Sequence, residues 1–158
     1  MCGISGVLGA SLESVEMRSI VTRMTRSQSH RGPDHEGYYQ DTDICMGHRR
    51  LSIIDLRSSA NQPLVDETGR YVITYNGEAY NYRELRTQLS GYKFRSNSDT
   101  EVVLYSYIEW GSECVLRLKG KFAFAIWDKQ RKELFLARDR LARNLFTIIT
   151  TTIPLLLL

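Results

Sequence analysis

The first residues of the chain place a nucleophile where it can have its own base. Removal of Met1 would leave Cys2 at the amino terminus, so that a thiol and a free α-amino group belong to one residue. A thiolate is the reactive form, and a thiol needs a base to take its proton. An α-amino group with a reference pKa of about 7.7–8.0 suits that task near neutral pH. Any protein can carry a cysteine at its second position, so this residue alone does not indicate a nucleophile. Other residues must support this chemistry.

Cleavage of an amide by a thiolate also needs an oxyanion hole, and the dipeptide Asn76-Gly77 can supply one. The Asn side-chain amide and the Gly backbone N–H are both neutral donors for a developing oxyanion. Gly also allows the backbone to approach a substrate closely. The alternative is an ordinary turn, because Asn-Gly is a common hairpin dipeptide and follows a strand predicted at 71–75.

A clamp for an amino acid needs a cation for the carboxylate and an anion for the ammonium group. Arg50 can pair bidentately with a carboxylate, and Asp99 can accept hydrogen bonds from an ammonium group. Each has an alternative role, as a surface charge or, for Asp99, as a helix cap. We interpret His30, His35 and His48 as structural or solvated, because a cysteine with its own amine needs no histidine base.

These residues must be positioned by strands and helices, and both patterns occur in the chain. β-branched, aromatic and alternating apolar residues predict strands at 2–9, 38–39, 44–51, 71–75, 122–127 and 134–138. The last two form a hairpin around a charged turn. Such antiparallel pairs, with helices collected between them, predict an α+β layered domain.

The predicted helices follow apolar stripes of helical spacing. They cover 11–29, 81–89 and 99–110, with a short helical turn at 115–118. Ser11 is expected to cap the first helix, and Asn81 with Glu84 resembles a capping box that opens the second. Ser98 or Asp99 is expected to cap the third.

The composition is that of a globular protein. The chain has 158 residues with 42% hydrophobic and 25% charged residues, which suits one domain with a sizeable core. A net charge of +3 gives no support for a nucleic-acid partner. Cys2, Cys45 and Cys114 are widely spaced, so we expect reduced thiols, no metal site and a cytoplasmic location. The start has no basic region typical of a signal peptide.

The end of the chain differs from the rest. Residues 145–158 read L-F-T-I-I-T-T-T-I-P-L-L-L-L and carry no charge. A bilayer span needs about 20 apolar residues, and Pro154 interrupts this shorter run, so no membrane association is expected. An edge strand or a disordered end is favoured instead. We therefore predict a domain at 2–146 and an atypical apolar tail at 147–158.

Eight short motifs follow one another along residues 1–140. They are Met1-Cys2-Gly3-Ile4, Arg31-Gly32-Pro33-Asp34, H-R-R-L-S-I-I-D-L at 48–56, Asn61-Gln62-Pro63-Leu64, Y-N-G-E-A-Y-N at 75–81, Ser98-Asp99-Thr100-Glu101, G-K-F-A-F-A-I-W-D at 120–128 and Ala137-Arg138-Asp139-Arg140. In these motifs the chain resembles the class of glutamine amidotransferase domain with an N-terminal cysteine nucleophile. It most resembles the N-terminal half of a glutamine-hydrolysing asparagine synthetase.

This resemblance implies a fold, a reaction and a set of site residues. The fold is the four-layer α-β-β-α sandwich of N-terminal nucleophile hydrolases. Cys2 attacks the glutamine side-chain amide and forms a glutamyl thioester, and water then releases glutamate. Ammonia travels to a synthetase domain for transfer to aspartate in asparagine biosynthesis. The catalytic residues are Cys2, Asn76 and Gly77, and the glutamine-binding residues are Arg50, Leu51, Ser52, Ile53, Ile54, Asn76, Gly77, Glu78 and Asp99.

Two departures from the family pattern stand at the end of the chain. The family continues after Asp-Arg with Leu-Gly-Arg-Lys-Pro-Leu-Tyr-Tyr, whereas residues 141–146 here are L-A-R-N-L-F. No Ser-Gly-Gly-x-Asp-Ser nucleotide loop occurs, so ATP and Mg²⁺ belong to the synthetase half and no cofactor is expected in this chain. We expect a truncated product or a free-standing glutaminase subunit. The alternative is an inactive glutamine-binding module.

Overall fold

Two antiparallel sheets form the centre of the fold. The computed structural model describes residues 1–9, 12–141, 144, 147–149 and 155–157. The first sheet has the strand order β2-β3-β1-β9-β8, and the second has the order β4-β5-β6-β7. Strands of the first sheet are β1 (Gly3–Leu8), β2 (His35–Gln40), β3 (Ile44–Arg50), β8 (Ile148–Ile149) and β9 (Leu155–Leu157). Strands of the second sheet are β4 (Leu64–Val65), β5 (Tyr71–Ala79), β6 (Gly120–Asp128) and β7 (Glu133–Arg138).

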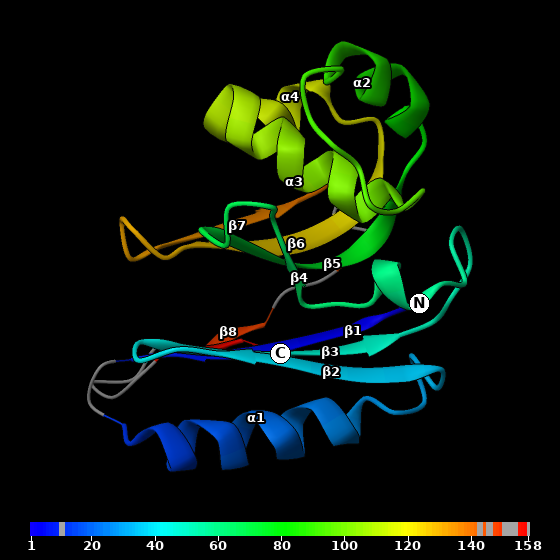
Figure 1. Cartoon of the computed structure of the whole chain (residues 1–158). Coiled ribbons are helices and arrows are strands. Elements are labelled where there is room, and N and C mark those ends of the chain that lie inside the picture. Colours follow the sequence, from blue (N-terminus) through cyan, green and yellow to red (C-terminus); the bar gives the residue numbers. More distant parts are fainter. Residues whose placement is uncertain (10–11, 142–143, 145–146, 150–154, 158) are drawn as a thin grey trace.

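Helices cover the outer face of each sheet. They are α1 (Ser14–Ser27), α2 (Tyr82–Gln88), α3 (Asp99–Trp110) and α4 (Cys114–Arg117), with 3₁₀ turns at Ser58–Ala60 and Gly111–Glu113. Figure 1 shows α1 against the first sheet and α3 over the second, with α2 and α4 grouped beside α3 and the two sheets facing each other between the helices. The predicted α+β layered class is therefore confirmed, and the layers follow the order helix, sheet, sheet, helix.

Successive side chains of a strand point to opposite faces of its sheet, so a separate core forms between each pair of neighbouring layers. On β5, Val72 packs between the sheets with Met46 and Trp127, whereas Ile73 and Tyr75 face the helices. A third cluster joins α1 to the first sheet through Val7, Met17, Val21 and Cys45. Burial on both faces fixes the register of β5, because a one-residue slip would exchange its two faces.

The turn interpretation of Asn76-Gly77 is wrong. Strand β5 continues through both residues to Ala79, and they pair with Ala123 and Phe122 of β6. A Cβ atom at Gly77 would lie 2.5 Å from the Lys121 carbonyl oxygen and 2.7 Å from the Phe122 Cα. The glycine is therefore required by the close approach of β6, and the ladder overrides the turn preference of the dipeptide.

The helix-cap predictions have mixed outcomes. Ser98 caps α3 as predicted, since its Oγ accepts a hydrogen bond from the Thr100 N–H at 3.1 Å. The capping box at Asn81 is wrong, because the Asn81 side chain bonds to the backbone of Arg117 and Lys119 instead. The first helix begins at Ser14, and Ser11 lies outside the described residues.

Two short strands occur in the apolar tail. Backbone pairing joins β9 to β1, with Leu155 opposite Leu8 and Leu157 opposite Gly6, and β8 pairs with β9 at the end of the sheet. The predicted edge strand is therefore seen at β8, whereas β9 lies inside the sheet between β1 and β8. In the part of the chain that the structure describes, no helix has the length and apolar character needed to cross a membrane.

His48 links the two sheets and is fully buried. Its Nε2 lies 3.1 Å from the Tyr75 carbonyl oxygen and donates to it, whereas its Nδ1 has no hydrogen-bond partner among the described residues. Burial lowers the pKa of His48 from 6.5 to about 3, with Arg50 and His35 adding repulsion. A second ring proton would lie buried without an acceptor, so the neutral form belongs to the folded state.

We expect His48 to make the protein less stable at acid pH. The unfolded chain takes up a proton near pH 6.5 and the folded chain does not, so stability falls with pH below 6.5 by up to about 1.4 kcal/mol per unit. Urea unfolding at pH 7 and pH 5 should show a loss of stability, of which His48→Gln removes about 2 kcal/mol. The surface variant His30→Gln is the control and should keep the loss. An unchanged pH slope in His48→Gln would contradict this assignment.

Candidate functional site

A pocket lies where the start of β1, the loop after β3, strand β5 and the start of α3 meet. It is lined by Met1, Cys2, Arg50, Leu51, Ile53, Ile54, Asp55, Ala60, Gln62, Tyr75, Asn76, Gly77, Glu78, Ser98, Asp99, Thr100, Lys121 and Asn144. Nine of the ten predicted site residues are among them. The exception is Ser52, whose backbone N–H donates to Asp34 at 2.7 Å.

The nucleophile candidate Cys2 is held by its backbone and by its sulfur. The Arg31 Nε donates to the Cys2 carbonyl oxygen at 3.1 Å. The Leu51 N–H donates to the Cys2 Sγ at 3.5 Å. Burial raises the pKa of the Cys2 thiol. The Leu51 N–H, the amino group of Met1 and Arg50 each oppose this rise in part. The sulfur is therefore a neutral thiol near pH 7, and its reaction needs a base.

The backbone of β5 directs the Gly77 N–H towards the pocket. Alternate residues of a strand present their N–H groups on the same side. The Tyr75 N–H donates to Gln62 Oε1 at 2.6 Å, and the Ala79 N–H donates to Asp99 Oδ2 at 2.9 Å. These two donors lie on the edge away from β6, and Gly77 stands between them. The Gly77 N–H therefore points to the same edge of β5. Strand β4 pairs with only two residues of β5, Val72 and Ile73, and so does not reach Gly77.

The Asn76 side chain supplies a second donor at the pocket. It is nearly buried, and among the described residues its amide group has no hydrogen-bond partner. Within the described part of the chain neither the Asn76 amide nor the Gly77 N–H donates to a partner, and two such donors are what an oxyanion hole requires. Asn76 and Gly77 thus both line the pocket, on the strand that faces Cys2.

Asp99 lies in the first turn of α3, with its carboxylate at the pocket. Its Oδ2 accepts hydrogen bonds from the Tyr75 hydroxyl at 2.8 Å and from the Ala79 N–H at 2.9 Å. Burial raises the pKa of Asp99, and these two donors oppose the rise. The carboxylate is thereby fixed in place as an acceptor for an ammonium group.

Arg50, at the end of β3, holds the loop that follows it. Its guanidinium donates to the carbonyl oxygens of Asp55 and Arg57 and to Asn61 Oδ1. Three of its five N–H donors are used in this way within the described residues, and two remain for a carboxylate at the pocket. Arg50 is thus a loop anchor as well as a candidate clamp.

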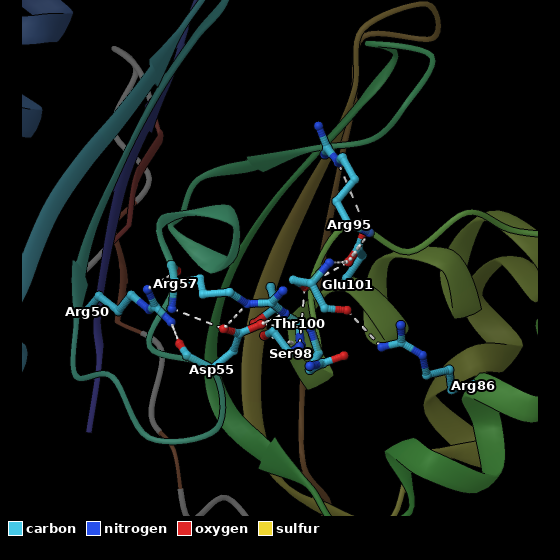
Figure 2. Close-up of polar contacts among 10 residues, drawn as sticks. Arg50, Asp55, Arg57, Arg86, Arg95, Ser98, Thr100 and Glu101 are labelled. Atoms are coloured by element: carbon cyan, nitrogen blue, oxygen red, sulfur yellow. Dashed lines mark hydrogen bonds and ion pairs between the residues drawn. The ribbon is translucent and has the colours of Figure 1, made fainter.

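Asp55 connects the Arg50 loop to the start of α3, as Figure 2 shows. Its carboxylate accepts from the Arg57 guanidinium at 2.6 and 2.9 Å and from the Asn97 N–H at 2.8 Å. These donors hold the pKa of Asp55 well below its usual range. Fully buried Glu101 then accepts from the N–H groups of Arg95 and Ser96. The two ends of the clamp are therefore fixed relative to each other.

Sequence reasoning missed several residues of the pocket. Asp55 and Gln62 lie in motifs that were recognised, but no local pattern indicates their contacts with Asn97 and Tyr75. Lys121 lies 3.6 Å from Glu78 at the rim. The pocket residues in the described part of the chain include no histidine, and no group of ligand side chains there could hold a metal ion.

Comparison with known proteins identifies the class to which this pocket belongs. Residues 1–150 match the family model described as a glutamine amidotransferase domain, and the chain belongs to that family. It is 43% identical over 144 residues to the glutamine-hydrolysing asparagine synthetase 3 of Bacillus subtilis, with 89% of this chain and 24% of the relative covered. It is 44% identical over 139 residues to the glutamine-hydrolysing asparagine synthetase 1 of Arabidopsis thaliana, with 88% and 24% covered. The chain therefore spans about a quarter of the length of these curated relatives.

Proposed function

We propose that this chain is a glutaminase module, which hydrolyses glutamine to glutamate and ammonia. One observation carries the proposal: Cys2, the Asn76-Gly77 donors and the charged pair Arg50 and Asp99 line the same pocket. This set supplies a nucleophile, an oxyanion hole and a clamp for an amino acid. We further propose that the helix–sheet–sheet–helix arrangement is the fold of the N-terminal nucleophile hydrolases.

The proposed reaction begins when Cys2 becomes the first residue. Its α-amino group takes the thiol proton, and Sγ bonds to the side-chain amide carbon of glutamine. The amide oxygen gains the negative charge and accepts hydrogen bonds from the Gly77 N–H and the Asn76 amide. Collapse of this intermediate breaks the C–N bond, and the ammonium form of the terminal amine returns the proton to the leaving nitrogen. Water then cleaves the thioester and releases glutamate.

We propose that the ammonia serves a synthetase domain or subunit. The curated relatives carry the name of glutamine-hydrolysing asparagine synthetases, and the chain corresponds to their N-terminal part. Transfer of ammonia to aspartate, with ATP and Mg²⁺ bound in the synthetase part, is the corresponding whole reaction. The glutaminase step itself proceeds with the residues of this pocket and needs no cofactor. We propose a cytoplasmic location on the basis of the widely spaced cysteines.

Turnover of the purified chain tests this function. We expect glutamate and ammonia in equal amounts from glutamine, and mass spectrometry should show Cys2 as the first residue of the active protein. A matched preparation that keeps Met1 should lose most of its rate, because a peptide nitrogen cannot act as the base. No glutamate from a protein that begins with Cys2 would refute the proposed function. Equal rates for the two preparations would refute the role of the amine.

A further inference from the structure

Asn144 holds the far side of the peptide unit that carries the Gly77 N–H. The Asn144 Nδ2 donates to the Asn76 carbonyl oxygen at 2.9 Å. The Asn76 carbonyl and the Gly77 N–H belong to one planar trans peptide unit, in which the oxygen and the hydrogen point in opposite directions. Asn144 therefore binds the peptide at its carbonyl oxygen and leaves the N–H on the opposite side directed to the pocket.

Asn144 is itself fixed in place. It is 3% exposed and lines the pocket. Its backbone N–H lies 3.4 Å from Asp139 Oδ2, and the same oxygen accepts from the Phe122 N–H at 3.2 Å. Phe122 is the residue of β6 that pairs with Gly77. Asn144 is thus tied through Asp139 to the ladder beside the candidate oxyanion hole.

From this geometry we infer that Asn144 is a positioning residue for the oxyanion hole, an inference that rests on the proposed glutaminase function. Its hydrogen bond adds to the pairing of Asn76 with Ala123 and sets the tilt of the Asn76–Gly77 peptide more narrowly, so the Gly77 N–H is aimed before the substrate arrives. It also polarises that peptide, because hydrogen bonds in a chain strengthen one another. Both effects favour the transition state, in which the oxyanion develops, more than the bound substrate.

Removal of the Asn144 amide should therefore lower kcat and leave KM almost unchanged. We expect Asn144→Ala and Asn144→Asp to lower kcat about tenfold, less than the 10²–10³-fold loss typical of a direct oxyanion donor. KM for glutamine should stay within about twofold, since the clamp residues are untouched. Aspartate has nearly the same shape as asparagine, so a packing defect would not account for a lower kcat in Asn144→Asp.

Asn81 offers a matched control. Its Nδ2 also donates to a backbone carbonyl, that of Arg117, at 2.9 Å, and it does not line the pocket. Asn81→Asp makes the same chemical change and should leave kcat unaltered. Alkylation of Cys2 by iodoacetamide, a displacement that forms no oxyanion, should keep its rate in both Asn144 variants and in Asn81→Asp.

Nuclear magnetic resonance reads the inferred contact without relying on turnover. In the Asn144 variants the Gly77 amide proton should move upfield, because the Asn76 carbonyl loses its side-chain donor and keeps only its pairing with β6. If the parent protein is active, an unmoved Gly77 resonance or an unchanged kcat in the Asn144 variants would overturn the inference. The proposed function would still stand. A parent protein that begins with Cys2 and releases no glutamate would instead refute the proposed function, and the inference with it.

Discussion

Replacement of Cys2 by alanine should abolish glutamine hydrolysis while the protein remains folded. The thiol is the attacking group, and loss of a covalent nucleophile lowers kcat by many orders of magnitude in other hydrolases, about 10⁶-fold in one well-studied case. Cys2 precedes β1, and its sulfur contacts only the backbone of Leu51 among its described hydrogen-bond partners, so alanine leaves the packing of the strands unchanged. The rate of glutamate release at saturating glutamine measures the effect.

The other two cysteines provide the controls for this result. Cys45 and Cys114 are fully buried in separate core clusters, and burial raises their pKa values to about 11 and about 12. Cys45→Ala and Cys114→Ala should lower the free energy of unfolding and keep kcat. Substantial glutamate release by Cys2→Ala, or its loss in both controls with the fold intact, would show that the nucleophile lies elsewhere.

Replacement of Asn76 by alanine should lower kcat for glutamine by about 10²–10³-fold, which is the usual loss for one oxyanion donor. KM should change little, because the amide N–H gains its importance only when the oxyanion forms. The backbone pairing of Asn76 with Ala123 remains in the variant, so the Gly77 N–H keeps its direction. Steady-state kinetics across glutamine concentrations separate kcat from KM.

A matched control for Asn76 is available at Asn97. The Asn97 side chain is exposed, and the residue acts through its backbone N–H, which donates to Asp55 and is retained in Asn97→Ala. That variant should therefore keep both constants. A change in KM alone for Asn76→Ala would assign Asn76 to glutamine binding and remove it from the oxyanion hole.

The strands and the candidate site could be predicted largely from local patterns. Runs of β-branched, aromatic and other apolar residues located β5 and β6, because a strand buried on both faces is apolar along most of its length. Local patterns failed where the backbone is governed by a distant partner. The Asn76-Gly77 turn was overridden by pairing with β6, and the Asn81 side chain serves the segment before β6 instead of its own helix.

The role of Asn144 could not be predicted for a related reason. It contacts a carbonyl 68 positions earlier, and nothing in the residues around it indicates that contact. Asp55 is similar, since its bond to the Asn97 N–H spans 42 positions. Residues proposed to contact the substrate can be recognised from their chemical type in the sequence. Residues that position them can be recognised only from the contacts in the folded chain.

The edge of β5 has a consequence for the size of the substrate. An exposed strand edge normally invites a second extended chain, which would bind through the backbone groups of alternate residues. Here the N–H groups of Tyr75 and Ala79 are already held by Gln62 and Asp99, on either side of Gly77. A polypeptide laid along this edge would find the N–H groups on either side of Gly77 already bonded. A single small amide can use the Gly77 N–H between them, so the edge admits a free amino acid and rejects a peptide strand.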